Sequence, residues 1–184
     1  MDRTLVVRAQ GGDHVAFERL AAEVAPGLDV VARLITRDPD RAKDAVQDAL
    51  IRAWRDLPTL RDPDRFEAWM RRLLVHACTD VLRRVRRWSI EVELHDVHRG
   101  DPDVATRVAD RAAIEHAFRT LHTDLRVVIV LHYYLGLTLP EVADTVGIPV
   151  GTTKSRLNRA LRDLRRTMAP PALGRINAEG EAVR

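Results

Sequence analysis

The sequence has little of what a secreted or membrane-spanning protein needs. Its 184 residues include a single cysteine, Cys78, which excludes an internal disulfide framework and fits a reducing cytosol. No apolar run approaches the roughly 20 residues that are needed to span a bilayer. The amino-terminal stretch MDRTLVVRAQGGD has no long apolar core before a cleavage site, so it does not read as a secretory signal. We therefore expect a cytoplasmic protein without membrane insertion.

Strand-like alternation is also scarce, and apolar residues recur instead at helical spacings. Asp13 can cap a helix that Pro26 and Gly27 interrupt, and a second helical segment covers residues 28–36. A further helix is expected over residues 40–57. Asp62 followed by Pro63 is a favourable start for a long helix that ends near residue 87.

These patterns predict an all-α protein of two small helical domains joined by a flexible linker. The first domain spans residues 1–87, and residues 88–107 form an acidic linker that interrupts the helical pattern. The second spans residues 108–168 and is expected to be a four-helix domain. Residues 169–184 have the polar composition of a disordered tail.

The stretch from Thr138 to Arg166 has the pattern of a helix-turn-helix. Thr138 and Glu141 have the spacing of a capping box, and Gly147 can adopt the left-handed backbone of a tight turn. In the following helix the apolar residues mark one inner face, so that the donors Lys154, Ser155, Asn158, Arg159 and Arg162 point away from it. Such donors suit phosphates and base edges, which favours DNA binding over a merely solvated face.

Two other charged surfaces admit several interpretations. Asp44, Gln47 and Asp48 form an acidic patch that, alone, is typical of a solvated helix face, although paired carboxylates also serve acid–base chemistry or metal binding. The helix after Pro63 carries many arginines, with Trp69 and Trp88 close by, which fits either a nucleic-acid surface or tryptophans packed in the core. His95 and His98 without a cysteine partner are a weak zinc signal. We expect no metal, no cofactor and no catalytic residue.

Four segments, in this order and at these distances, resemble an extracytoplasmic-function (ECF) sigma factor of the sigma-70 family over residues 5–167. They are GDHVAF at 12–17, DAVQDALIRAW at 44–54, FEAWMRRL at 66–73 and GTTKSRLNRAL at 151–161. The resemblance implies a non-enzymatic specificity subunit that binds core RNA polymerase and promoter DNA, recognises the minus-35 and minus-10 elements, and aids promoter melting. It also implies a separate anti-sigma factor.

The resemblance assigns roles to particular residues. Its polymerase-binding positions are Asp44, Gln47 and Asp48, which replaces the interpretation as a solvated face. Its minus-10 positions are Phe66, Trp69, Arg72, His76, Thr79 and Arg83, and its minus-35 positions are Lys154, Ser155, Arg156, Asn158 and Arg159. His76 stands where the family usually has Asn, and Thr153 replaces the commoner Val. The preferred promoter sequence is therefore left open.

Two alternatives remain at this stage. A one-component DNA-binding regulator would use only the second domain, but it would not need the first 87 residues in this form. A helical adaptor or an enzyme is a more distant alternative. Promoter-specific transcription with core polymerase separates all three.

Overall fold

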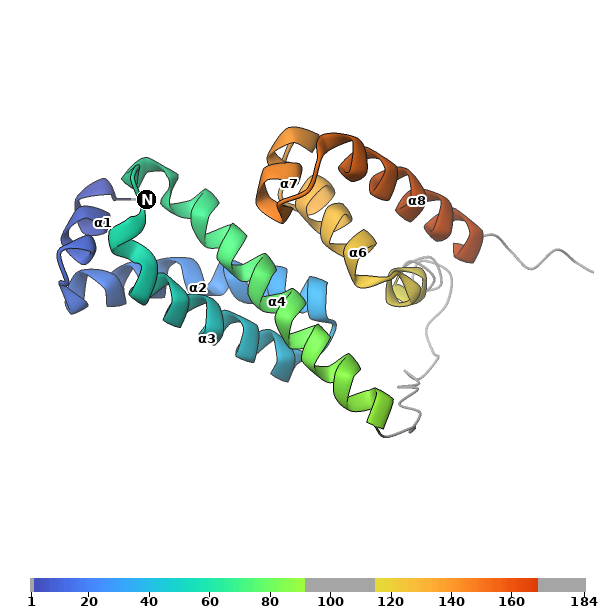
Figure 1. The fold of residues 1–184 in the computed structure, drawn as a ribbon, viewed down its shortest axis with the longest axis horizontal. Coiled ribbons are helices and arrows are strands. Elements are labelled where there is room, and N and C mark those ends of the chain that lie inside the picture. The colour runs from blue at the N-terminus through green and yellow to red at the C-terminus, as the bar shows by residue number, and fades with distance from the viewer. Residues whose placement is uncertain (1, 92–114, 169–184) are drawn as a thin grey trace, which may run out of the picture.

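The computed structural model describes residues 2–91 and 115–168 of the chain. In these ranges every regular element is helical and no strand occurs, which confirms the all-α prediction. Figure 1 shows a first unit, coloured blue to green, beside a second unit coloured yellow to red. The predicted tail, His95, His98 and nearly all of the predicted linker lie outside the described residues.

The first unit consists of α1 (Arg3–Gln10), α2 (His14–Thr36), α3 (Pro39–Asp56) and α4 (Phe66–Glu91). Two 3-10 turns, Leu57–Thr59 and Pro63–Arg65, connect α3 to α4. The side of α3 that faces α2 and α4 presents only small fully buried residues, which are Ala42, Ala45, Ala49 and Ala53. Small side chains let α3 pack closely against α2 and α4, and this packing leaves the polar face of α3 outward.

Helix α2 runs without interruption through Pro26, where the sequence predicted a break. Proline removes one backbone hydrogen bond and typically costs about 3 kcal/mol within a helix. Pro26 is exposed, while Leu20 and Leu28 on either side of it are buried in the same core. Packing of both halves of α2 against α3 and α4 therefore offsets the local cost.

Helix α1 was not predicted, because its pattern is short. The Asp2 side chain accepts a hydrogen bond from the Thr4 backbone N–H and so caps the helix, and Val6 and Ala9 are buried. At its end, the Gln10 amide donates to the carbonyls of Leu57 and Leu60 at 3.2 and 2.6 Å. These bonds fix the connection that leads into α4.

Asp62 and Pro63 start the 3-10 turn Pro63–Arg65 instead of α4 itself, which begins at Phe66 and extends to Glu91, four residues past the predicted end at residue 87. Asp62 accepts a hydrogen bond from the Asp64 backbone N–H, and Pro63 follows at the first helical position. The helix therefore ends later than predicted, and the domain boundary at residue 88 stays a prediction.

The second unit contains a helical segment at residues 115–120, then α6 (Thr123–Ile129), α7 (Leu139–Val146) and α8 (Val150–Met168). Helix α6 continues into a π-helical segment, Val130–Tyr134. The capping box of Thr138 and Glu141 is present, and Gly147 adopts the left-handed conformation with φ 74°. Thr153, Leu157 and Ala160 bury the inner face of α8. The predicted helix-turn-helix is confirmed.

The capping box gives α7 a pH-dependent stability. The Thr138 hydroxyl and then the Thr138 backbone N–H, by hydrogen bonding to the Glu141 carboxylate, hold the pKa of Glu141 below its ordinary value of 4.5. A native pKa below the unfolded one adds stability that is present above the unfolded pKa and is lost as pH falls through the native pKa. We expect the unfolding free energy to fall less steeply in Thr138→Ala than in the native chain between about pH 5 and pH 3.

Chemical denaturation at several pH values measures this difference. Thr167→Ala is the matched control, because the Thr167 hydroxyl donates to a backbone carbonyl and touches no carboxylate. Parallel pH profiles for the native chain and Thr138→Ala would contradict the prediction.

Cys78 is fully buried on α4, and burial raises the pKa of its thiol to about 12. Only the thiolate form of a cysteine reacts with disulfides. We therefore expect the folded protein to resist a chromogenic aromatic disulfide at about pH 8 and to react fully once urea unfolds it. The absorbance of the released thiolate follows the reaction. Fast labelling of the folded chain would contradict the burial of Cys78.

The two units pack against each other, which the sequence did not predict. Helix α4 contacts α7, and α2 contacts α6. Arg72 on α4 pairs with Asp144 on α7 at 2.5 Å, and the Arg37 guanidinium donates to the Arg119 backbone carbonyl at 2.5 Å. The helix expected to face the minus-10 element is therefore in contact with the helix-turn-helix unit.

Candidate polymerase and nucleic-acid interfaces

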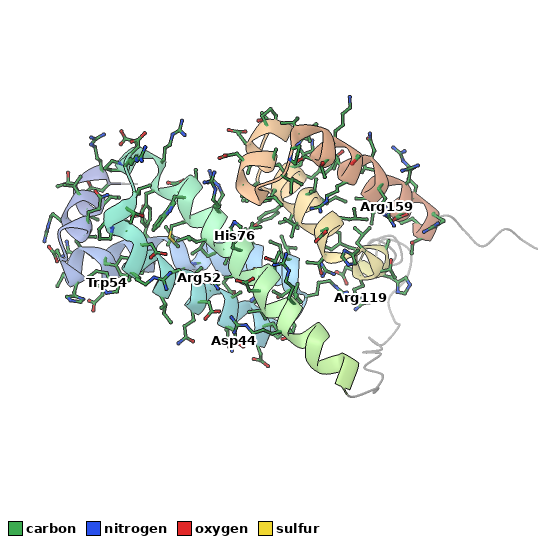
Figure 2. All side chains as sticks on the ribbon, viewed as in Figure 1. Asp44, Arg52, Trp54, His76, Arg119 and Arg159 are labelled. Carbon is green, nitrogen blue, oxygen red and sulfur yellow. The ribbon has the colours of Figure 1, made fainter. Side chains whose placement is uncertain are left out.

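The outer face of α3 carries the acidic patch. Asp44 and Gln47 are exposed, and Asp48 is partly exposed. No hydrogen-bond or ion-pair partner of Asp44 is found among the described side chains, which are those of residues 2–84 and 115–168. Figure 2 shows Asp44 at the lower edge of the molecule, away from α7 and α8. This carboxylate is therefore accessible to a second protein without rearrangement.

Asp48 differs from Asp44 because it lies in a row of ion pairs between α3 and α4. Its carboxylate pairs with Arg84 at 3.0 Å, and Arg52 one turn later pairs with Asp80 at 2.9 Å. These cross-helix pairs orient α4 on α3. A partner that binds Asp48 must share it with Arg84, so Asp44 offers the less compensated charge.

The structure separates the predicted minus-10 residues into two groups. Phe66 is only 1% exposed, and Trp69 is partly buried with its ring 6.1 Å from that of Phe66. The placement of Phe66 among DNA-contacting side chains is therefore not supported, because its ring fills the core at the start of α4. The buried Phe66 ring anchors the start of the helix, whereas a minus-10 role for the partly exposed Trp69 stays a prediction.

The remaining four residues follow one face of α4 at spacings of four, three and four. His76 and Arg83 are exposed, whereas Arg72 and Thr79 are partly exposed. The Thr79 hydroxyl donates to the His76 carbonyl at 2.8 Å, and Arg83 lies 3.9 Å from Asp80. Together they form a polar, cationic face of the kind that follows a nucleic-acid backbone.

The α4–α7 contact involves two arginines of this helix and two acids of α7. Arg72 pairs directly with Asp144, and the charge of Arg71 contributes to the lowered pKa of Glu141. The Arg71 Nε is buried and has no hydrogen-bond partner. The second unit thus draws a predicted DNA-contacting side chain into an ion pair. Sequence reasoning could not find this contact, because its partners are 72 residues apart.

Helix α8 presents the predicted minus-35 set. Lys154, Ser155, Asn158 and Arg159 are exposed. Figure 2 labels Arg159 on α8. Arg156 is set apart, because it is partly buried and pairs with Asp124 at 3.1 Å. It ties α8 to the start of α6 and is less available to DNA than its neighbours. Arg162 and Arg166 extend the exposed basic surface beyond Arg159.

Within residues 2–91 and 115–168, no group of three or more His, Cys, Asp or Glu side chains is arranged to hold a metal ion. In the same part of the chain, no helix is both long and apolar enough to cross a membrane.

Comparison with known proteins bears on both units. Residues 20–88 match the family model for sigma-70 region 2, and residues 111–164 match the model for sigma-70 region 4. The sequence is 31% identical to the ECF RNA polymerase sigma factor SigM of Mycobacterium tuberculosis over 91% of this chain and 84% of that protein. It is also 31% identical to the ECF RNA polymerase sigma-E factor of Haemophilus influenzae, over 92% of this chain and 96% of that protein.

Solved structures agree with the sequence matches. CnrH, solved in complex with the cytosolic domain of CnrY, superposes with a TM-score of 0.60 at 30% identity and covers 90% of this chain and 95% of its own. RpoE of Bartonella quintana, solved with the anti-sigma factor NepR, shares the fold with a TM-score of 0.63 over 83% of this chain and 96% of its own, at 24% identity. The chain therefore belongs to the extracytoplasmic-function group of the sigma-70 family, whose members are RNA polymerase sigma factors that act in transcription initiation.

Proposed function

We propose that this chain directs core RNA polymerase to promoters with minus-10 and minus-35 elements and helps to melt them. Sigma factors are specificity subunits without the catalytic site of the polymerase, and none of the surfaces above needs catalytic chemistry. The observation that carries the proposal is the separation of charge. The acidic patch occupies the outer face of α3, whereas the proposed DNA-binding donors follow other helices, α4 and α8.

The proposal assigns each face one partner. Asp44 and Gln47, with Asp48, bind the polymerase. Arg72, His76, Thr79 and Arg83 contact the minus-10 element, where opening a base step costs a few kcal/mol that stacking and phosphate contacts can offset. Lys154, Ser155, Asn158 and Arg159 bind the minus-35 duplex. Arg156 supports α8 through Asp124, and Phe66 supports α4 from the core.

Run-off transcription with purified core polymerase tests the proposal. Transcript starts are first mapped after forced expression of the chain, and the promoters found in this way serve as templates. We expect transcripts from these templates and none from a control duplex with scrambled minus-10 and minus-35 elements. Core enzyme that gains no promoter preference from the chain would refute the assignment.

We also propose that an anti-sigma factor regulates this chain. CnrH and RpoE were each solved in complex with a protein of their own, and both chains resemble this one over most of their length. The exposed acidic and basic faces are the surfaces such a partner would cover. Affinity purification from the native cell, with the chain at its natural level, is expected to recover a stoichiometric partner that blocks run-off transcription. Recovery of core polymerase alone would count against it.

A further inference from the structure

A groove of about 1200 Å³ lies between the two units. The end of α2 and the start of α3 form one side of it, and residues 115–120 and the π-helical segment form the other. Its polar and aromatic lining includes Arg33, Arg37, Arg41, Arg119, Tyr133 and Tyr134. None of these residues belongs to the polymerase-binding or promoter-binding sets.

The cations of this groove are not all compensated. Arg33 pairs with Asp29 at 2.6 Å, and Arg41 pairs with Asp38 at 3.3 Å. The other lining carboxylate, Glu115, also has an interaction of its own. Arg37 and Arg119 have no carboxylate partner in the described part of the chain. The pKa of Arg37 is lowered mainly by burial and secondly by the charge of Arg119, which shows that the two guanidinium groups lie close together.

A third uncompensated cation lies next to them. Arg126 is only 5% exposed, and its guanidinium makes one long hydrogen bond, 3.4 Å to the Thr123 hydroxyl. Its Nε has no partner. Burial and then the charge of Arg37 lower the pKa of Arg126 to about 10. A buried cation without a counter-charge is costly, so three neighbouring guanidinium groups favour the binding of an anion.

The backbone at Arg37 is also unusual. Arg37 has φ 61° and is the one non-glycine residue with a positive φ among the described residues. Glycine or asparagine normally occupies this left-handed position after a helix. An arginine here is strained, and strained backbone tends to persist where a side chain has a function. Its guanidinium reaches across the groove to the Arg119 carbonyl.

The opposite wall offers aromatic surface. Tyr133 and Tyr134 are 60% and 55% exposed at the end of the π-helical segment, and such segments are frequent at functional sites. The Tyr133 ring packs edge-on against His132 at 4.9 Å, and the His132 Nδ1 lies 2.7 Å from the Leu137 carbonyl. These contacts hold one ring in place facing a groove large enough for a small ligand.

We propose that this groove binds a small phosphorylated ligand with a planar ring system, of the nucleotide class. Arg37 and Arg119 bind its phosphate groups, the buried Arg126 near Arg37 adds positive charge, and a tyrosine ring stacks on its base. Both units contribute residues, so the ligand favours the packed arrangement of the units. If the proposed function holds, the ligand opposes initiation, because a two-part promoter requires the units to separate.

Isothermal titration of the full chain with ADP, GDP, inorganic pyrophosphate and adenosine tests the site. We expect binding of a nucleoside diphosphate, weaker binding of pyrophosphate and no binding of adenosine. Arg37→Gly removes the guanidinium and relieves the positive φ, so the fold is kept, and affinity is expected to fall roughly tenfold to a hundredfold. Arg119→Gln, which keeps the carbonyl that Arg37 binds, is expected to lose a similar factor.

Arg41→Gln is the matched control, because it removes one positive charge from the same groove at a residue already paired with Asp38. Its affinity is expected to stay within about twofold of the native chain. Absence of heat with all four compounds at millimolar concentration would overturn the proposal. Equal losses in Arg41→Gln and Arg37→Gly would also overturn it, since they indicate a diffuse basic surface. Titration needs neither polymerase nor DNA, so its outcome is independent of run-off transcription.

Discussion

Reversing the charge of Asp44, as Asp44→Lys, is expected to weaken binding to core RNA polymerase roughly a hundredfold or more. The reason is that one attraction is lost and one repulsion is gained at an interface charge. Asp44 is the preferred position because it is exposed and has no partner among the side chains of residues 2–84 and 115–168. Reversal of Asp48 would also break its pair with Arg84 and could disturb the α3–α4 packing.

Fluorescence anisotropy of a labelled chain titrated with core enzyme measures this loss. Glu23→Lys is the matched control, because Glu23 is an exposed acid on α2 outside the acidic patch. We expect Glu23→Lys to bind core enzyme like the native chain and both variants to keep their melting temperatures. Binding of duplex DNA by Asp44→Lys is expected to be unchanged. Native-like polymerase affinity for Asp44→Lys would remove α3 from the proposed interface.

Covalently joining the two units is expected to abolish promoter-dependent transcription. The minus-10 and minus-35 elements lie about 25 base pairs apart, which is about 85 Å at 3.4 Å per base pair. In the structure α4 contacts α7, and Arg72 pairs with Asp144. The two DNA-binding faces cannot occupy both elements in this arrangement. If the proposed function holds, the chain must therefore open before it spans a promoter.

Residues 37 and 119 allow this experiment without altering the predicted DNA-binding or polymerase-binding residues. A double variant, Arg37→Cys with Arg119→Cys, can be joined by a thiol cross-linker with a reducible spacer as long as the arginine side chain. Cys78 is buried and inert, so it does not compete for the reagent. We expect the joined chain to give no run-off product and to recover activity once the spacer is reduced.

A cross-link within one helix serves as the control. Asp29 and Arg33 lie one turn apart on α2 and are paired, so cysteines at these positions can be joined without linking the units. This chain is expected to support transcription before and after reduction. Full activity of the chain joined at 37 and 119 would show that initiation tolerates the packed arrangement.

The ion pair between Arg72 and Asp144 gives the packed arrangement a direct link to DNA binding. Arg72 is partly exposed and is one of the four residues on the proposed minus-10 face of α4. In the packed arrangement Asp144 already neutralises the charge of Arg72, so this arginine is not free to bind a DNA phosphate. The exposed pair itself contributes only about 0 to 1 kcal/mol, so opening does not require a large energy. Binding to the polymerase and to the promoter can supply it.

Local sequence patterns predicted most helices correctly because the interactions that define them lie within four residues. Asp13 caps α2, Thr138 and Glu141 form the capping box of α7, and Gly147 makes the left-handed turn. The inner face of α8 also follows from spacing alone. Errors arose where distant packing opposed a local rule. Pro26 lies inside a continuous helix, because both halves of α2 are held by α3 and α4.

In the candidate surfaces, too, local patterns predicted which residues are exposed, whereas distant packing decided which of them are paired. The acidic residues of α3 and the donors of α8 were predicted on exposed faces, since an amphipathic helix fixes which side faces the core. Whether an exposed residue is free depends on the helix that lies opposite. Arg84 engages Asp48, and Asp124 engages Arg156. Phe66 follows the same logic, because its position in a family motif does not reveal its burial.

By itself the sequence determined the all-helical fold, the helix-turn-helix and the family, because periodicity, capping and motif order are recorded along the chain. Tertiary structure alone decided the contact of α4 with α7, the partners of Asp48 and Arg72, and the groove that brings Arg37 next to Arg119 and Arg126. These features join residues 30 to 90 positions apart, roughly. Such pairings depend on how whole helices pack, and no local pattern encodes them.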